Sequence, residues 1–252
     1  MNRAHGNALI ASTLQQHRRR NMRNPLRSSL LWVLFACLAG CSTASEAHTL
    51  VTGVELRDTP PPAACPAQLK AALRPGCMVV RSLGEDVLRI WSVRELKRAQ
   101  SPQAFSDVAY GEIAEGALAG VVEVCASWYD YRDQAVKLGL YTLRYALVRA
   151  DPAALVHERW RDALFFLPLD KDPDPARVWP LELLRAFATG DREDAIPRRM
   201  ALFPAQEGRG PAKGDPPRLV GNPLNQPMLS FWVQDINLNL VVAGSVFLSN
   251  QQ

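Results

Sequence analysis

The chain is poor in the residues that enzymes most often use as general bases and nucleophiles. It has four histidines and five cysteines, and only His48 and His157 lie outside the first 40 positions. It contains no Gly-x-Ser-x-Gly elbow, no phosphate-binding glycine loop and no dinucleotide fingerprint. It also has no Cys-x-x-Cys pair and no Cys/His spacing suited to zinc or haem. We therefore expect no metal and no cofactor.

The sequence also lacks an apolar run long enough for a membrane-spanning helix. The longest run near the N-terminus, Leu30 to Ala39, is about half the ~20 residues that such a helix needs. Five of the six arginines of residues 1–40 lie at positions 18, 19, 20, 23 and 27, before this run. A basic segment followed by a short apolar segment is typical of a signal peptide. We predict a signal peptide over residues 1–40, with Met22 as an alternative start.

The apolar run ends in Leu38-Ala39-Gly40-Cys41, which resembles the lipobox of bacterial lipoproteins. The resemblance implies that the Cys41 thiol is diacylated and that the chain is cut just before it. An ordinary secretory signal, with Cys41 placed there by chance, is the alternative. Ser42, in place of an aspartate, favours the outer membrane and a periplasm-facing domain over the inner membrane. Residues 41–50 would then form a short lipidated tether.

Removal of the leader changes the sign of the net charge. The full chain has 29 Lys and Arg against 25 Asp and Glu, and residues 1–40 contain six arginines and no acidic residue. The mature chain therefore has 23 basic and 25 acidic residues, a net charge of about −2. Basicity thus gives no reason to expect nucleic acid as a partner. The expected partners are the membrane, through the lipid, and an envelope protein or glycan.

Three cysteines remain in the expected oxidising compartment. Cys65 and Cys77 flank a helix-like segment, Pro66 to Leu73, and a turn, Arg74-Pro75-Gly76. A disulfide between them would close a loop of about a dozen residues and stabilise the fold by up to ~3 kcal/mol, and we predict this pair. We expect Cys125, in an apolar strand, to be a buried free thiol.

The apolar pattern is mostly that of short strands. Leu140 to Val148 alternates, and Leu118 to Cys125 is a nearly unbroken apolar run. Strands are also expected over 87–93 and 163–169, and a C-terminal hairpin has its turn at Asp235-Ile236-Asn237. The polar Asn237 and Asn239 predict a solvated face there.

Helical signal is limited to two short segments, Pro66 to Leu73 and a segment that begins at Pro180 and closes at Gly190. Residues 205–217 are rich in Gly, Pro and Lys and predict a long surface loop. We count eight or nine strands and two helices. This predicts a mainly β fold over residues 51–252: one antiparallel β-sandwich, immunoglobulin-like or jelly-roll-like.

The segment Lys137 to Leu143 has the Gly-x-Tyr-x-Leu form in which a strand enters an immunoglobulin-like sandwich. In that form Tyr141 bonds back to the preceding corner, and Leu143 takes the place of a core cysteine. No Cys–Trp–Cys framework accompanies it, so a true immunoglobulin domain is not expected. The stretch from Leu83 to Leu169 resembles an uncharacterised family of secreted bacterial β-rich proteins, and the resemblance implies the fold only.

Two groups suggest sites but have simpler interpretations. Asp170, Asp172 and Asp174 alternate like the start of a calcium loop. However, Pro175 and Leu181 stand where that loop needs glycine and glutamate, so we expect a solvated acidic turn. His157 lies between charged residues in a loop-like stretch and is interpreted as a surface histidine.

The remaining candidate is an aromatic loop at the end of a strand, with Trp128, Tyr129, Tyr131 and Arg132. Aromatic side chains are common in binding surfaces. We predict a non-catalytic, membrane-anchored binding or accessory module that uses this loop, although Trp128 also fits a core position. The alternative is a hydrolase of an envelope component with a pair of carboxylates drawn from Asp130, Asp133 and Asp162.

Overall fold

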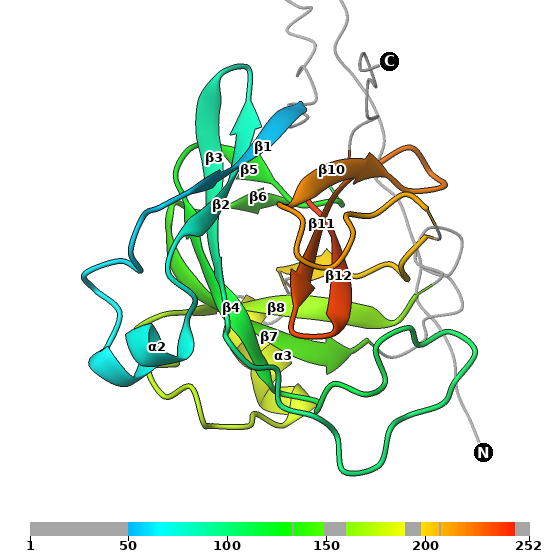
Figure 1. Cartoon of the computed structure of the whole chain (residues 1–252). Coiled ribbons are helices and arrows are strands. Elements are labelled where there is room, and N and C mark those ends of the chain that lie inside the picture. The colour runs from blue at the N-terminus through cyan, green and yellow to red at the C-terminus, as the bar shows by residue number, and fades with distance from the viewer. Residues whose placement is uncertain (1–49, 133, 149–159, 190–197, 207, 245–252) are drawn as a thin grey trace, which may run out of the picture. The chain divides into compact units, whose positions relative to one another are not determined.

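The computed structural model describes residues 50–132, 134–148, 160–189, 198–206 and 208–244. All of them belong to the compact unit that spans Glu46–Gln252. Their dominant element is a seven-stranded antiparallel sheet that curls over a smaller three-stranded sheet (Figure 1). The predicted mainly β fold is therefore confirmed, and the arrangement is consistent with a sandwich. Within the described part of the chain, no helix is long and apolar enough to cross a membrane.

The seven-stranded sheet has the order β1-β2-β3-β4-β7-β8-β9, the small sheet has the order β10-β11-β12, and β5 pairs with β6. Two helices accompany the strands among the described residues. The bounds are β1 Val51–Arg57, α2 Ala67–Ala72, β2 Cys77–Ser82, β3 Glu85–Ser92, β4 Leu118–Val124, β5 Trp128–Tyr129, β6 Ala135–Val136, β7 Gly139–Leu147, β8 Asp162–Pro168, α3 Leu181–Thr189, β9 Arg199–Ala201, β10 Arg218–Gly221, β11 Pro227–Val233 and β12 Ile236–Val241.

The small sheet lies between the two edges of the curled sheet. At one edge, Leu202 just after β9 pairs with Leu240 of β12, and the Phe203 N–H donates to Asn239 O at 2.9 Å. At the other edge, β10 lies close to β1 without a hydrogen-bonded ladder. Register shifts in the β1–β2, β2–β3 and β4–β7 pairings mark irregularities that bend strands. The curl brings the inner face of the large sheet onto the small sheet.

The main core fills the space between the two inner faces. Leu143 and Tyr145 of β7 point into it and are almost fully buried, as the alternation of that strand predicts. The opposite face of β7 and β8 is also buried, because α3 packs on it through Leu184 and Ala188. Both faces of the central strands are therefore covered.

The strands expected over 87–93, 118–125, 140–148 and 163–169 are present with end shifts of one or two residues. Both predicted helices are also present, as α2 and α3. The expected number of strands was too low, because the described residues contain twelve. The missed strands include β5, β6 and β9, which have two or three residues and carry no readable period. Residues 205, 206 and 208–217 contain no helix or strand, in agreement with the predicted surface loop.

The tyrosine corner is confirmed. The Tyr141 hydroxyl donates to the backbone oxygen of Lys137 at 2.9 Å, four residues earlier. Gly139 between them has φ +148°, a conformation that side-chain-bearing residues rarely adopt. The corner fixes how β7 enters the sheet.

The C-terminal hairpin is present, but its polar face is solvated only in part. Val233 pairs with Ile236, so the turn consists of Gln234 and Asp235, and Gln234 has φ 56°. Asn239 is only 2% exposed, because the segment around Tyr110 covers it. The Tyr110 hydroxyl accepts from the Asn239 backbone N–H at 3.1 Å and donates to Phe203 O at 2.6 Å. The expectation of a solvated face was therefore wrong for Asn239, whereas Asn237 is half-buried.

The acidic turn is solvated only in part, because Asp170 and Asp174 are exposed and Asp172 is not. Asp172 is fully buried and accepts from Nε and Nη2 of Arg144 at 2.7 and 2.8 Å. It also accepts from the Trp179 indole at 2.7 Å. Arg144 is buried as well and donates to the backbone oxygens of Asp174 and Arg177. One aspartate of the turn thus forms a buried ion pair that holds the connection between β8 and α3 on the sheet, whereas Asp170 stays exposed.

The predicted Cys65–Cys77 disulfide is not formed in the structure, where both cysteines are free and buried. Cys65 precedes α2, Cys77 begins β2, and each thiol packs in the main core as a small apolar group. Burial raises the pKa of both thiols. Cys125 is half-buried rather than buried, and burial raises its pKa to about 11.

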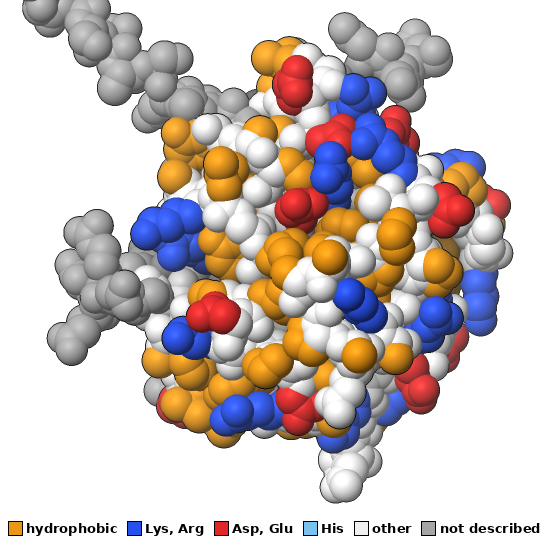
Figure 2. All heavy atoms as spheres, turned by 90° about the vertical axis from the view of Figure 1, so that its left-hand side faces the viewer, with side chains coloured by type: hydrophobic (Ala, Val, Ile, Leu, Met, Phe, Trp, Pro, Cys, Tyr) orange, Lys and Arg blue, Asp and Glu red, His pale blue; other side chains and the backbone are white. Residues whose placement is uncertain are grey.

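A charged cluster crosses the outer face of β1 to β3. Arg57 of β1 donates through Nη2 to Asp86 of β3 at 2.9 Å and so spans the intervening strand. Arg89 also donates to Asp86, at 3.0 Å, and to Glu123 of β4, at 3.2 Å. Figure 2, which looks at this side of the molecule, shows acidic and basic side chains next to one another near its top. Since β1 is an edge strand, this cluster helps to hold it on the sheet.

We expect Asp172→Asn to lower the free energy of unfolding by roughly 3–5 kcal/mol, because it leaves the Arg144 guanidinium buried without its counter-ion. The control Asp170→Asn removes an exposed carboxylate of the same turn and should change stability by less than about 0.5 kcal/mol. Urea denaturation followed by tryptophan fluorescence measures both. Equal effects of the two substitutions would contradict the structural role of the pair.

We expect Asp86→Asn to destabilise the protein at neutral pH and to do so less as the pH falls. Hydrogen bonds from Arg57 and then Arg89 lower the pKa of Asp86 below its usual 3.8. The stabilisation is thus fully present at a pH above the pKa that Asp86 has in the unfolded chain. It is lost as the pH falls through the lower pKa that Asp86 has in the folded protein. Denaturation curves at neutral pH and at about pH 3 measure the difference. Glu85→Gln, at an exposed position of the same strand, is the control, and a pH-independent loss for Asp86→Asn would contradict this assignment.

Candidate functional site

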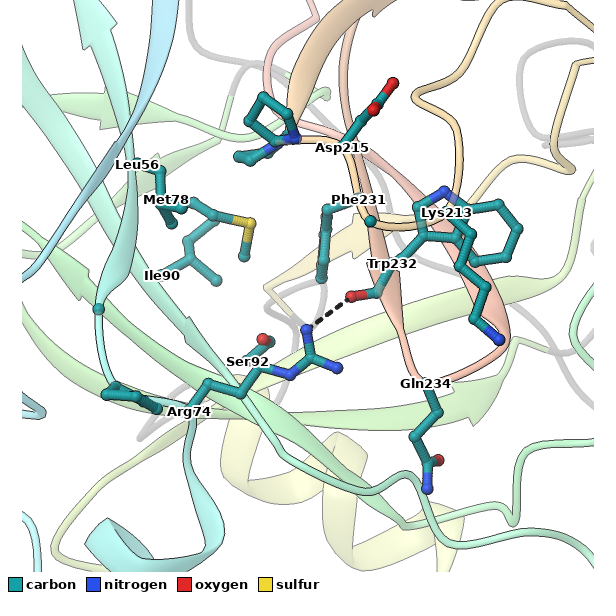
Figure 3. Close-up of a pocket in the computed structure, with 15 residues that line it drawn as sticks. Leu56, Arg74, Met78, Ile90, Ser92, Lys213, Asp215, Phe231, Trp232 and Gln234 are labelled. Carbon is teal, nitrogen blue, oxygen red and sulfur yellow. Dashed lines mark hydrogen bonds between the residues drawn. The ribbon is translucent and has the colours of Figure 1, made fainter.

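The inner faces of the two sheets separate at one end of the core and leave a cleft of about 580 Å³. Strands β1 to β3 form one wall, β11 forms the facing wall, and residues 213–217 of the loop before β10 lie at its rim (Figure 3). Volumes of a few hundred cubic ångströms are typical of sites for small ligands. The cleft is therefore the continuation of the core at the place where the sheets do not meet.

One wall of the cleft is a row of apolar side chains across three strands. The register pairs Leu56 of β1 with Met78 of β2, and Met78 with Ile90 of β3. Their exposed fractions fall from 61% to 5% to 1% from the sheet edge inward. Phe231 of β11 faces this row across the cleft (Figure 3) and is 6% exposed. The apolar row therefore runs from solvent into the core.

The polar groups of the cleft lie toward one of its ends, and the first of them is Arg74. Arg74 follows α2, where its backbone N–H donates to Ser92 O at 2.9 Å. Its Nη1 donates to the backbone oxygen of Trp232 at 3.1 Å, the dashed line in Figure 3. No carboxylate among the described residues forms an ion pair with Arg74, and its other guanidinium N–H groups have no acceptor there. The cleft thus contains a partly buried, uncompensated cation.

The loop at the rim is fixed to β11. The Trp232 indole donates to Pro211 O at 2.8 Å, and Oδ2 of Asp215 accepts from the Ala212 N–H at 3.1 Å. Asp215 also pairs with Arg218 at 3.5 Å. Lys213 is exposed and lies beside Trp232 (Figure 3). The acidic group of the rim therefore already has partners, whereas Lys213 adds a positive charge at the rim.

The predicted aromatic loop does not line this cleft. Trp128 is 1% exposed, packs against Phe166 at 5.6 Å between ring centroids, and donates to Val242 O at 2.8 Å. It is a core residue, as one of the two interpretations had it. Tyr129 is half-buried in the short β5 strand.

The rest of that loop is organised around a buried carboxylate. Asp130 accepts from the backbone N–H groups of Arg132 and Gln134 at 2.9 and 3.0 Å, and it pairs with the Arg132 guanidinium at 3.3 Å. Burial raises the pKa of Asp130. Arg132 also lies over the Tyr131 ring, and the Tyr131 hydroxyl accepts from Arg199 at 3.1 Å. The structure thus brings Tyr131 and Arg132 together in contacts within the protein.

Two of the three carboxylates proposed for a hydrolase, Asp130 and Asp162, lie among the described residues, and both accept hydrogen bonds within the protein. Asp162 is 1% exposed and accepts from the Tyr110 N–H at 3.0 Å and from the Tyr145 hydroxyl at 2.7 Å. Burial raises its pKa. Neither Asp130 nor Asp162 lines the cleft. Asp133, His157 and Cys41 lie outside the described residues.

Among the residues that the structure describes, no group of three His, Cys, Asp or Glu side chains is placed to hold a metal ion. Comparisons with protein-family models, curated protein sequences and solved structures found no match. The cleft is therefore the feature on which a functional argument rests.

Little in the sequence indicates the cleft. The sequence predicts the C-terminal hairpin that contains Phe231, and Arg74 and Lys213 lie in segments expected to be a turn and a loop. Nothing in the pattern indicates that these segments meet, because 139 positions separate Arg74 from Lys213. Only the curl of the sheet brings them together.

Proposed function

We propose that this chain is a bacterial envelope lipoprotein, anchored by an acylated Cys41, whose folded domain is a non-catalytic binding module. The ligand site in this proposal is the cleft between the sheets, in place of the aromatic loop at residues 128–132. Ser42 favours the outer membrane, with the domain facing the periplasm. The partners are then the membrane, through the lipid, and an envelope component in the cleft.

The observation that carries the binding role is the combination of an apolar row that reaches solvent at Leu56 with a cation that has no counter-ion among the described residues. Leu56 exposes 61% of its surface at the mouth of the cleft, next to the buried Met78. An apolar side chain beside an open cleft loses contact with water when a ligand enters, which favours binding. Arg74 supplies a polar group that selects and orients the ligand.

A non-catalytic role is supported by what the cleft is made of. The side chains that line it offer no histidine, no cysteine and only one carboxylate, Asp215, which is paired with Arg218. General acid–base catalysis needs a positioned group with a suitable pKa. The buried Asp130 and Asp162 instead accept hydrogen bonds from neighbouring backbone and side-chain donors.

The anchor is tested by Cys41→Ser in the full chain. We expect the wild-type protein to carry the fatty-acid label and to stay in the membrane fraction. We expect the variant to be unlabelled, and either soluble or still joined to its leader, because serine has no thiol for the acyl transfer. Fractionation after metabolic labelling with a fatty acid measures both. Labelling of the variant, or an unlabelled wild type, would contradict the anchor.

The site is tested by photo-crosslinking in cells. p-Benzoylphenylalanine at position 56 lies at the mouth of the cleft, whereas at position 138 it replaces Leu138, which has a similar exposed fraction of 64% but does not line the cleft. We expect an adduct, seen by mass spectrometry, at position 56 and not at position 138. Equal adducts at the two positions, or none at position 56, would count against the cleft.

A further inference from the structure

We propose that the ligand of the cleft is a single-chain alkyl carboxylate, with its chain along Leu56, Met78 and Ile90 and its carboxylate on Arg74. This inference rests on the proposed function and names the chemical class of ligand for the same site. It follows from three features of the cleft: its apolar row, its volume and its charge.

The apolar row fits an extended chain. Leu56, Met78 and Ile90 are cross-strand neighbours on three adjacent strands, so together they form a straight strip perpendicular to the strands. Neighbouring strands are about 4.8 Å apart, so the strip is roughly 10 Å long. Phe231 faces it from β11 (Figure 3). The strip is open to solvent only at Leu56, since Met78 and Ile90 are 5% and 1% exposed, so a narrow alkyl chain of about eight to ten carbons suits it better than a bulky ring system.

The charge of the cleft selects an anionic head group. Arg74 uses one donor for Trp232 O and has further N–H groups without an acceptor among the described residues. A guanidinium binds a carboxylate through parallel hydrogen bonds, which are stronger than those between neutral groups. Lys213 at the rim adds long-range attraction. A cationic head group would be repelled by both residues.

The same groups favour a carboxylate over a phosphate monoester. A phosphate monoester carries a charge of about −1.5 to −2 at neutral pH, and only Arg74 lies in the cleft itself as a partly buried cation. Lys213 stands at the rim beside Asp215, which is paired with Arg218, so a second negative charge on the ligand would find no second cation inside the cleft. One negative charge therefore matches the site.

The test is calorimetric titration of the full chain carrying Cys41→Ser, which removes the acylation site and allows work without detergent. The probes are decanoate, decyl phosphate and decylammonium below their micelle concentrations. We expect one decanoate per chain, with decylammonium at least about tenfold weaker and decyl phosphate weaker than decanoate. Octanoate and hexanoate should bind progressively more weakly, on the order of threefold per methylene removed.

Two matched pairs of substitutions locate the ligand. Arg74→Gln should weaken decanoate about tenfold, whereas Arg94→Gln, which removes an exposed arginine bonded to Ala71 O at 3.2 Å, should not. Leu56→Gln should weaken it about fivefold, whereas Leu138→Gln should not. Thermal unfolding by circular dichroism identifies any variant that fails to fold. The comparison of decanoate, decyl phosphate and decylammonium needs no substitution in the cleft. It therefore tests the inference even if a cleft variant fails to fold.

The inference is overturned if decanoate does not bind, if decylammonium binds as tightly, or if folded Arg74→Gln retains full affinity. It is also overturned if the cleft takes an extended peptide and no alkyl carboxylate. An adduct at position 56 in cells together with no binding of decanoate would reject the alkyl carboxylate and leave the binding module standing. Failure of both would reject the cleft as a site.

Discussion

The inner face of the curled seven-stranded sheet is the constraint on which the rest of the structure depends. Its apolar side chains must be covered, and a three-stranded sheet covers them by lying between the edges β1 and β9. The cover is continuous at β9, where Leu202 pairs with Leu240. At β1 no ladder closes the gap, and the row that begins at Leu56 stays open. The cleft is thus a consequence of how the core is closed, not an addition to it.

Polar groups inside the core are tolerated because each has partners. Arg144 and Asp172 neutralise each other and bind backbone oxygens and an indole. Asp162 of β8 accepts hydrogen bonds from the Tyr110 N–H and from the Tyr145 hydroxyl of β7. The Tyr110 hydroxyl in turn accepts a hydrogen bond from the Asn239 N–H of β12. An unpartnered buried polar group costs about 1–3 kcal/mol, and a charged one more. Arg74 differs from these groups because its guanidinium reaches the cleft and forms no ion pair with a carboxylate among the described residues, so its charge is open to a ligand.

The sequence predicted local features well and polar burial poorly. The Gly-x-Tyr-x-Leu motif predicted a contact over four residues, and the Tyr141–Lys137 bond is present. The acidic turn was expected in solvent because aspartates usually are, yet Asp172 meets Arg144 from 28 positions earlier. Asn239 was misjudged for the same reason. The predicted disulfide followed from loop length and compartment, whereas in the structure both thiols are free and buried in the core.

The sequence by itself determined the strand-rich composition of the fold, the two short helices and the corner at Tyr141, because each depends on residues close together in the chain. Tertiary structure alone decided which strands are buried on both faces, which charged side chains pair, and where the two sheets separate. These depend on the curl of the large sheet and on where α3 and the segment around Tyr110 pack. Leu56, Arg74 and Phe231 become one cleft only through that curl, since no local pattern in the chain connects them.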